Sequence, residues 1–281
     1  MNIRPSPIAG RWYPGHPKTL ARDLNQYLAQ ADVRPPQGRV WGVVAPHAGY
    51  LYSGSVAAYA FKCLQGLQPE LVVVISPLHF AHRAPLLTTA YEAYETPLGL
   101  VDVDEQAVYR LNDALKRRAG FECTPLHRDT EHSLEIELPF LQHVLRDFRL
   151  LPIMIRDQRL GVVKALGQAL AETLQEQQVL LVASSDLSHF NPQAYADKLD
   201  AELLRRVEAF DPLAVMEAEE AGVGFACGRG AIAAVLWAAK QLGANRVRVL
   251  HHATSGDVSG DYTAVVGYGA AVIWQEDGQS N

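Results

Sequence analysis

Short apolar runs rich in Val, Ile and Leu alternate along the chain with longer segments whose apolar residues recur at helical spacing. The runs predict buried strands at residues 39–45, 70–76, 149–155, 178–184, 246–251 and 262–274. The segments of helical period lie at residues 16–31, 53–67, 105–118, 133–146, 160–175, 192–210 and 230–242. Because strands that alternate with helices form βα units, the pattern predicts an α/β fold with a largely parallel or mixed central sheet flanked by helices.

The chain shows no sign of a boundary between domains. Its 281 residues contain no internal repeat, no low-complexity tract and no shift in composition. We therefore expect one α/β domain over residues 1–281, in which the polar residues 275–281 form a frayed tail.

Composition and charge exclude several classes of protein. Hydrophobic residues make up 48% of the chain and charged residues 20%, which is typical of a folded globular protein. The net charge of −6 and the lack of a basic block argue against a nucleic-acid partner. No apolar stretch is long enough to span a membrane or to act as a secretory signal, and the three cysteines are too widely spaced for a disulfide framework. These features predict a cytoplasmic protein with no membrane partner.

Polar side chains follow three of the predicted strands. His47 follows the first run and His79 the second, while Asp186 and His189 follow the fourth. Because the carboxyl ends of parallel strands border one crevice, these side chains are expected to converge although they are far apart in sequence. A histidine in such a place can also be an ordinary loop residue, so the prediction of a shared site depends on the whole set.

Cys227 lies between glycines, directly before the helix predicted at residues 230–242. A helix N-terminus and the nearby Arg229 would both favour the thiolate, which binds metals or attacks electrophiles. The alternative is a small buried apolar residue. Together with His47 and His79, Cys227 would form a set of two imidazoles and one thiolate that admits Fe(II), copper or zinc, and the ligand types do not choose among them.

Three further residues are candidates for acid–base work. Asp186 and His189 lie three residues apart, so His189 is a candidate proton carrier and Asp186 its partner. Asp186 is also suited to cap backbone N–H groups of its own loop. His132 and Glu135 share one face at the start of a predicted helix, where acidic residues are more often caps than ligands, so we expect His132 to contact substrate or support the ligands.

Six ordered pieces of the sequence resemble the Memo family, also called AmmeMemoRadiSam system protein B. The pieces are RPSPIAGRWYP at residues 4–14, PHAGY at 46–50, EHSLE at 131–135, SSDLSH at 184–189, CGR at 227–229 and SGDVSG at 255–260. They extend over nearly the whole chain, and their shared order makes the resemblance far more specific than any single piece.

The resemblance implies a fold similar to that of class III extradiol ring-cleavage dioxygenases, which use non-haem Fe(II) to insert dioxygen into catechols. It also assigns the family's site residues to six positions, with His47, His79 and Cys227 as metal ligands and Asp186, His189 and His132 around them. The dioxygenases have a glutamate where the family has the cysteine. Because a thiolate changes the potential of iron and is itself oxidisable, the fold alone does not assign ring cleavage to this chain.

The function expected from these features is redox or oxygen-dependent chemistry at a metal site, with Fe(II) favoured over copper or zinc and a substrate that the sequence does not identify. One alternative is a non-catalytic adaptor that binds a metal, a peptide or a small ligand in the same crevice. Another is a thiol hydrolase or transferase with Cys227 as nucleophile, His189 as base and Asp186 as its orienting partner. The resemblance further implies radical-SAM and AMMECR1-like proteins as partners.

Overall fold

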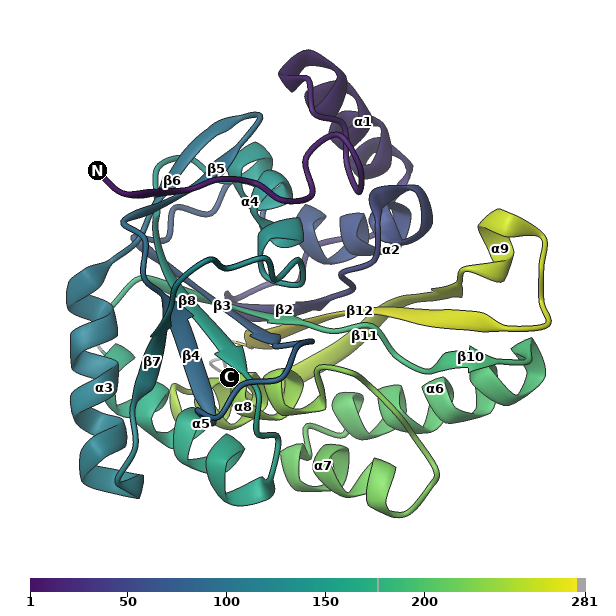
Figure 1. Cartoon of the computed structure of the whole chain (residues 1–281). Helices are drawn as coiled ribbons and strands as arrows, with labels where there is room; N and C mark the ends of the chain where they lie inside the picture. Colours follow the sequence, from purple (N-terminus) through teal and green to yellow (C-terminus); the bar gives the residue numbers. More distant parts are fainter. Residues whose placement is uncertain (176, 277–281) are drawn as a thin grey trace, which may run out of the picture.

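A nine-stranded mixed sheet forms the centre of the computed structural model, which describes residues 1–175 and 177–276 (Figure 1). The strands are hydrogen-bonded in the order β10-β12-β2-β9-β3-β8-β4-β7, and β11 pairs with β12. Their bounds are β2 Arg39–Ala45, β3 Leu71–Pro77, β4 Leu86–Thr89, β7 Cys123–Leu126, β8 Arg149–Ile155, β9 Val179–Ser184, β10 His189–Asn191, β11 Arg246–Thr254 and β12 Val265–Gln275.

The middle of the sheet is parallel and the flanks are mixed. Strand β9 pairs in parallel with β2 and β3, and β3 pairs in parallel with β8. Strand β12 is antiparallel to β2, β10 and β11, and β4 is antiparallel to β8. Every residue of β3 and β9 is buried, as expected for parallel strands covered on both faces. The predicted α/β fold with a mixed central sheet flanked by helices is confirmed.

Helices cover both faces of this sheet (Figure 1). On one side lie α1 Pro17–Gln30, α2 Tyr50–Lys62 and α4 Leu138–Val144, which follows the short 3-10 helix η1 Glu135–Glu137. On the other side lie α3 Glu105–Ala119, α5 Leu160–Leu174, α6 Gln193–Glu208, α7 Pro212–Glu220 and α8 Arg229–Gln241. No helix in the described part of the chain is long and apolar enough to cross a membrane.

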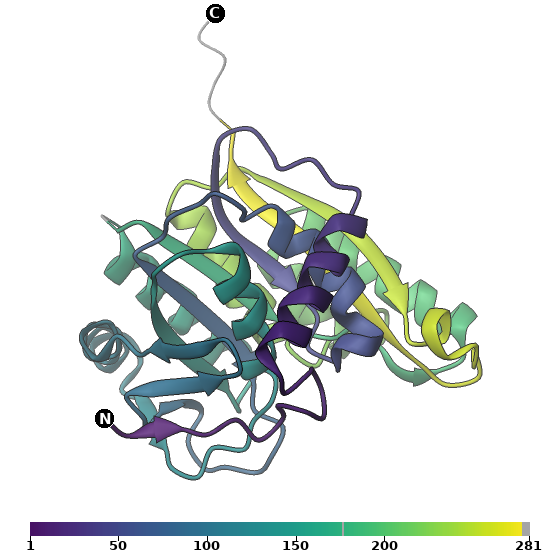
Figure 2. The same cartoon turned by 90° about the horizontal axis from the view of Figure 1, so that it is seen from above.

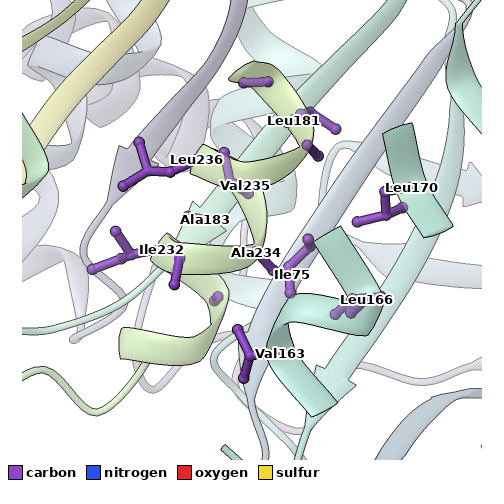
Figure 3. Packing of buried hydrophobic residues seen from close by; sticks show 14 of the residues in the cluster. Ile75, Val163, Leu166, Leu170, Leu181, Ala183, Ile232, Ala234, Val235 and Leu236 are labelled. Carbon is purple, nitrogen blue, oxygen red and sulfur yellow. The ribbon is translucent and has the colours of Figure 1, made fainter. Parts of the chain in front are cut away.

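Two apolar clusters fill the space between the sheet and its helices. Neighbours on β3 belong to different clusters, Val74 to the one under α1 and α2, and Ile75 to the one under α5 and α8, because successive side chains of a strand point to opposite faces. Figure 3 shows the second cluster, in which α8 and α5 pack with their apolar faces over Ile75 and Leu181. The sheet is thereby fixed on both sides, which holds the loops at its strand ends in place.

The structure adds short elements that the hydrophobic pattern does not predict. They include α7, β4, β7 and β10, the short helix α9 Gly256–Ser259, and a separate sheet of β1 Ile3–Arg4, β5 Ala93–Thr96 and β6 Gly99–Asp102. Figure 2 shows the N-terminal strand β1 at the edge of this small sheet, where it pairs in parallel with β5. Runs of two to four residues are too short to reveal a period, which explains why the pattern misses these strands.

The structure also differs from the prediction at one helix and at the C-terminal tail. The helix predicted at 133–146 divides into η1 and α4. In the expected tail, Gln275 is the last residue of β12 and the N–H of Glu276 donates to Asn245 Oδ1 at 2.9 Å. The rest of that expected tail, residues 277–281, lies outside the described residues.

Candidate functional site

The structure brings three predicted ligands together at the carboxyl ends of the central strands. His47 lies two residues beyond β2, His79 two residues beyond β3, and Cys227 precedes α8 by two residues. One donor atom from each of the three lies within 4.8 Å of the others, and Cys227 Sγ is 3.2 Å from His47 Nε2. Two imidazole nitrogens and a sulfur at this spacing could hold one metal ion.

A hydrogen-bond chain fixes the orientation of the His47 ring. Nδ1 of His47 lies 2.9 Å from Ser184 Oγ, and this hydroxyl donates to the Ser133 carbonyl at 2.6 Å. Since the single hydroxyl proton is used there, His47 Nδ1 must be the donor to Ser184. Nε2 then carries no proton and its lone pair faces Cys227. A histidine that binds a metal through Nε2 requires this tautomer.

Glu131 orients His79 in the same way. Its Oε1 lies 2.9 Å from His79 Nδ1, and its Oε2 accepts the His79 backbone N–H at 2.6 Å. Although burial opposes ionisation, the hydrogen bonds that His79 donates hold the pKa of Glu131 well below its usual range. The carboxylate therefore accepts the Nδ1 proton and leaves Nε2 of His79 free to bind.

The sequence predicts a thiolate at Cys227, but the structure favours the protonated thiol. Burial raises the pKa of the thiol well above its ordinary value, and the neighbouring Asp186 raises it further. The guanidinium of Arg229 pairs instead with Glu219 of α7. The prediction that the helix terminus and Arg229 favour a thiolate is therefore wrong for the protein without a cation, because desolvation dominates.

A glycine lets the Cys227 turn approach the sheet. A Cβ on Gly228 would lie 2.5 Å from the Ser184 carbonyl oxygen, a separation that no side chain tolerates. The Gly228 N–H donates to Ser185 Oγ at 2.9 Å, and the Cys227 N–H donates to the Asp186 carbonyl at 3.2 Å. The sulfur is thus held by backbone contacts to the loop that follows β9.

Asp186 and His189 lie at the same end of β9, but their hydrogen bonds go to other groups. Asp186 Oδ1 accepts the His47 backbone N–H at 2.8 Å, and burial raises the pKa of this carboxyl to about 7. His189 Nδ1 donates to the Leu187 carbonyl at 2.8 Å, which leaves its Nε2 as an acceptor, and burial lowers the pKa of the ring. The expected pairing of Asp186 with His189 is replaced by these backbone contacts.

His132 completes the wall of the site. Its ring stacks on that of His79 with the centroids 4.6 Å apart, and the ring of Trp12 lies 4.2 Å away on centroids. Burial lowers the pKa of His132 to about 4, although Glu131 opposes the shift. Donor atoms of His79, Glu131 and His132 also lie within 4.8 Å of one another, but Glu131 is already committed to orienting His79.

A cavity of about 260 Å³ opens beside His189, between α6 and the segment that follows α7. Tyr195 and Phe225 contribute aromatic side chains to its lining. Three larger cavities share no residue with the site. Those of about 610 and 580 Å³ are lined by residues around β6 and the start of α3, and that of about 340 Å³ lies at the starts of β2 and β9. Size alone therefore does not identify the functional cavity in this protein.

The orienting residues were not among the candidates from sequence. Glu131 stands beside His132 in one of the quoted pieces, but its contact with His79 crosses 52 positions and has no spacing signal. Ser184 is the last residue of a buried strand and resembles other small strand residues. Their roles become visible only when the strand ends are assembled.

Comparisons with known proteins identify the family of this chain. The Memo-like protein family matches residues 4–272. A MEMO1 family protein of Nitrosopumilus maritimus is 36% identical over 274 residues, covering 95% of this chain and 98% of the relative. A MEMO1 family protein of Thermotoga neapolitana is 37% identical over 282 residues, covering 96% and 99%.

The fold is also found among solved structures at low identity. The uncharacterized protein JW3007 of Escherichia coli K12 superimposes with a TM-score of 0.56 at 14% identity, over 84% of this chain and 100% of that one. At such identity the likeness concerns the fold alone. Given the family match over nearly the whole chain and the relatives of equal length, this chain belongs to the Memo-like protein family.

Proposed function

We propose that this protein binds Fe(II) through His47, His79 and Cys227 and uses it for redox or oxygen-dependent chemistry on a small substrate. The observation that carries the proposal is the orientation of both imidazoles. Their Nδ1 atoms are hydrogen-bonded to Ser184 and Glu131, so the metal-binding nitrogens are free and lie close to the sulfur of Cys227. Three protein ligands leave coordination positions open, as metal sites that carry out chemistry require.

The charge at the site also suits a divalent cation. Burial raises the pKa of the Cys227 thiol, so without a cation the sulfur keeps its proton and donates it toward His47 Nε2 at 3.2 Å. A bound cation would replace that proton, since metals bind the thiolate. The ionised Glu131 adds negative charge directly behind His79. The donor set therefore fits a metal ion better than it fits a free nucleophilic thiolate.

When bound, an iron ion would supply redox chemistry at the coordination positions that the protein leaves open. The similarity to class III extradiol dioxygenases that the Memo-family resemblance implies would favour iron over zinc. His189 would serve as proton acceptor through its free Nε2, at the wall of the cavity of about 260 Å³. Asp186 holds the backbone of His47, and with a pKa of about 7 it also changes protonation near neutral pH.

Anaerobic reconstitution with Fe(II) tests this proposal. We expect one iron per chain in the wild-type protein and little in Cys227→Ala and His47→Ala, followed by oxygen consumption with a subset of small substrates such as catechols. Cys123→Ala is a matched control, because Cys123 is a buried free cysteine remote from the ligand set. Equal iron content in wild-type protein and Cys227→Ala would contradict the proposed metal site. Stoichiometric iron without any oxygen uptake would favour the non-catalytic adaptor.

A further inference from the structure

A buried arginine lies behind the site and has no part in the ligand set. Arg4 of β1 is 0% exposed. Its Nε donates to Asp129 Oδ2 at 2.5 Å, one terminal nitrogen donates to Glu135 Oε2, and the other donates to the Glu131 backbone carbonyl at 2.6 Å. A fully buried arginine with three such contacts is rare, because moving a charge out of water is costly.

The contacts of Arg4 enclose the segment that carries Glu131 and His132. Asp129 precedes this segment and Glu135 follows it. Between them, the guanidinium also donates a hydrogen bond to the Glu131 carbonyl. Asp129 adds a second restraint, since its Oδ1 accepts the Glu131 backbone N–H at 2.8 Å. The backbone of Glu131 is therefore fixed at both its N–H and its carbonyl.

The side chain of Glu131 points the other way, toward the ligands. It accepts the Nδ1 proton of His79 at 2.9 Å and the backbone N–H of His132 at 2.9 Å. A short chain of contacts thus leads from Arg4 through the Glu131 backbone to the His79 ring. Moving that backbone would weaken the contact that keeps the proton of His79 on Nδ1.

Arginine is suited to this task by its geometry. Its planar fork of donors defines three acceptor positions at once, whereas lysine offers a compact point charge. Other groups hold the fork in place, since the ring of Tyr94 lies 4.8 Å from the guanidinium carbon and Tyr13 donates to Glu135 Oε1 at 2.7 Å. If bulk stability were the only requirement, apolar residues of similar volume would meet it as well.

We propose that Arg4 is a positioning residue for the metal site: it fixes the Glu131 backbone so that the carboxylate keeps His79 in its Nδ1–H form and His132 against the His79 ring. This inference rests on the proposed function, in which His79 is a ligand. It extends that function to an N-terminal residue that touches none of the three ligands.

Histidine NMR on the metal-free protein tests the proposal independently of metal binding. Long-range ¹H–¹⁵N spectra of protein labelled at its ten histidines report the tautomer of each ring, and His79→Gln assigns the His79 signals. In the wild-type protein we expect a single Nδ1–H form at His79. In Arg4→Lys and Arg4→Met we expect a mixture of tautomers, and a Co(II) affinity lower by about tenfold, as for other groups that orient metal ligands.

Arg206→Met is the matched control. Arg206 is a largely buried arginine that donates to Glu202 at 2.8 Å and to the Ala214 carbonyl at 2.7 Å, away from the ligands. We expect its removal to leave the His79 signals and the Co(II) affinity unchanged, even if the protein becomes less stable. A merely structural role for Arg4 predicts that the two arginines behave alike.

The outcomes separate this inference from the metal site itself. A folded Arg4 variant with wild-type His79 signals overturns the inference, and if Arg4→Met fails to fold, Arg4→Lys decides because it keeps the buried positive charge. If the wild-type protein binds no Co(II), the proposed metal site fails, while the tautomer of His79 still shows whether Arg4 positions the ring.

Discussion

Glu131 Oε1 lies 2.9 Å from Nδ1 of His79, so a carboxylate with 2% residue exposure selects which nitrogen of that imidazole faces the site. Carboxylates of this kind are common behind metal-bound histidines, where they fix the tautomer and strengthen the ligand. The relationship assigns a role to Glu131 that its place in the sequence does not suggest.

Replacing this carboxylate should weaken metal binding without removing a ligand. We expect Glu131→Gln to lower the affinity for Co(II) by about 10–100-fold, because an amide can present its N–H₂ group to His79 and favour the wrong tautomer. Competition with a chromophoric chelator measures the affinity. Glu122→Gln is the control, since Glu122 pairs with Lys116 on the surface. Unchanged affinity in Glu131→Gln would show that His79 needs no orienting partner.

The sulfur of Cys227 should give the bound metal its spectroscopic signature. Co(II) bound to wild-type protein should show thiolate-to-metal charge-transfer absorption in the near ultraviolet, which Cys227→Asp should lose while keeping weaker binding through oxygen. Cys63→Ala should retain the band, since Cys63 is a buried free cysteine outside the ligand set. A band that persists in Cys227→Asp would assign the sulfur ligand to another cysteine.

His189 should affect turnover more than metal binding. Its Nδ1 is bound to the Leu187 carbonyl and its ring borders the cavity of about 260 Å³, so we expect it to move a proton of the substrate. His189→Ala should keep the wild-type iron content and lose about 10²–10⁴-fold in rate, the usual contribution of general acid–base catalysis. Iron analysis and oxygen uptake on the same sample measure both. Loss of iron in His189→Ala would instead indicate that His189 is a metal ligand.

The strand ends that carry the ligands could be predicted from sequence for a simple physical reason. β2, β3 and β9 are continuous apolar runs, so their limits are visible, and His47 and His79 stand directly beyond two of them. Parallel pairing of β9 with both neighbours then places those ends together. The shared edge therefore follows from the βα pattern, without prediction of any individual side-chain contact.

The charged groups behind the ligands could not be predicted in this way. Arg4 and Glu131 are polar residues of short or irregular segments, which usually lie in solvent, yet both are buried in this protein. The protonation of Cys227 was wrongly predicted because burial raises the pKa of the thiol, and because Arg229 pairs with Glu219, on a helix that the hydrophobic pattern does not reveal. Such pairings depend on tertiary contacts that no local pattern encodes.

Stability of the metal-free protein should fall as the pH is lowered below about 6.5, the ordinary value for histidine. Burial lowers the pKa of five histidines in the folded protein, namely His47, His132, His143, His189 and His251. The unfolded chain therefore binds protons first on acidification, so the unfolding free energy decreases as the pH falls.

The size of this effect can be isolated at one residue. The pKa of His132 is lowered to about 4, so its contribution should be lost progressively between about pH 6.5 and pH 4. Urea unfolding at several pH values should give a shallower dependence for His132→Gln than for the wild-type protein. Asp186 acts in the opposite direction, since its raised pKa of about 7 favours the folded state when protonated. Equal pH dependence in both proteins would contradict the lowered pKa of His132.

The close approach of Gly228 to β9 should make this position intolerant of any side chain. A Cβ there would lie 2.5 Å from the Ser184 carbonyl oxygen and 2.8 Å from the Ser185 side chain, so the Cys227 turn must move outward. We expect Gly228→Ala to cost about 1–3 kcal/mol of unfolding free energy and to weaken Co(II) binding, because the sulfur moves with the turn. Gly161→Ala in α5 is the control, because the added Cβ has no neighbour outside its own helix within 4 Å. It should leave the unfolding free energy and the Co(II) affinity undiminished. If Gly228→Ala lost stability but kept full Co(II) affinity, the sulfur would not depend on this turn for its place.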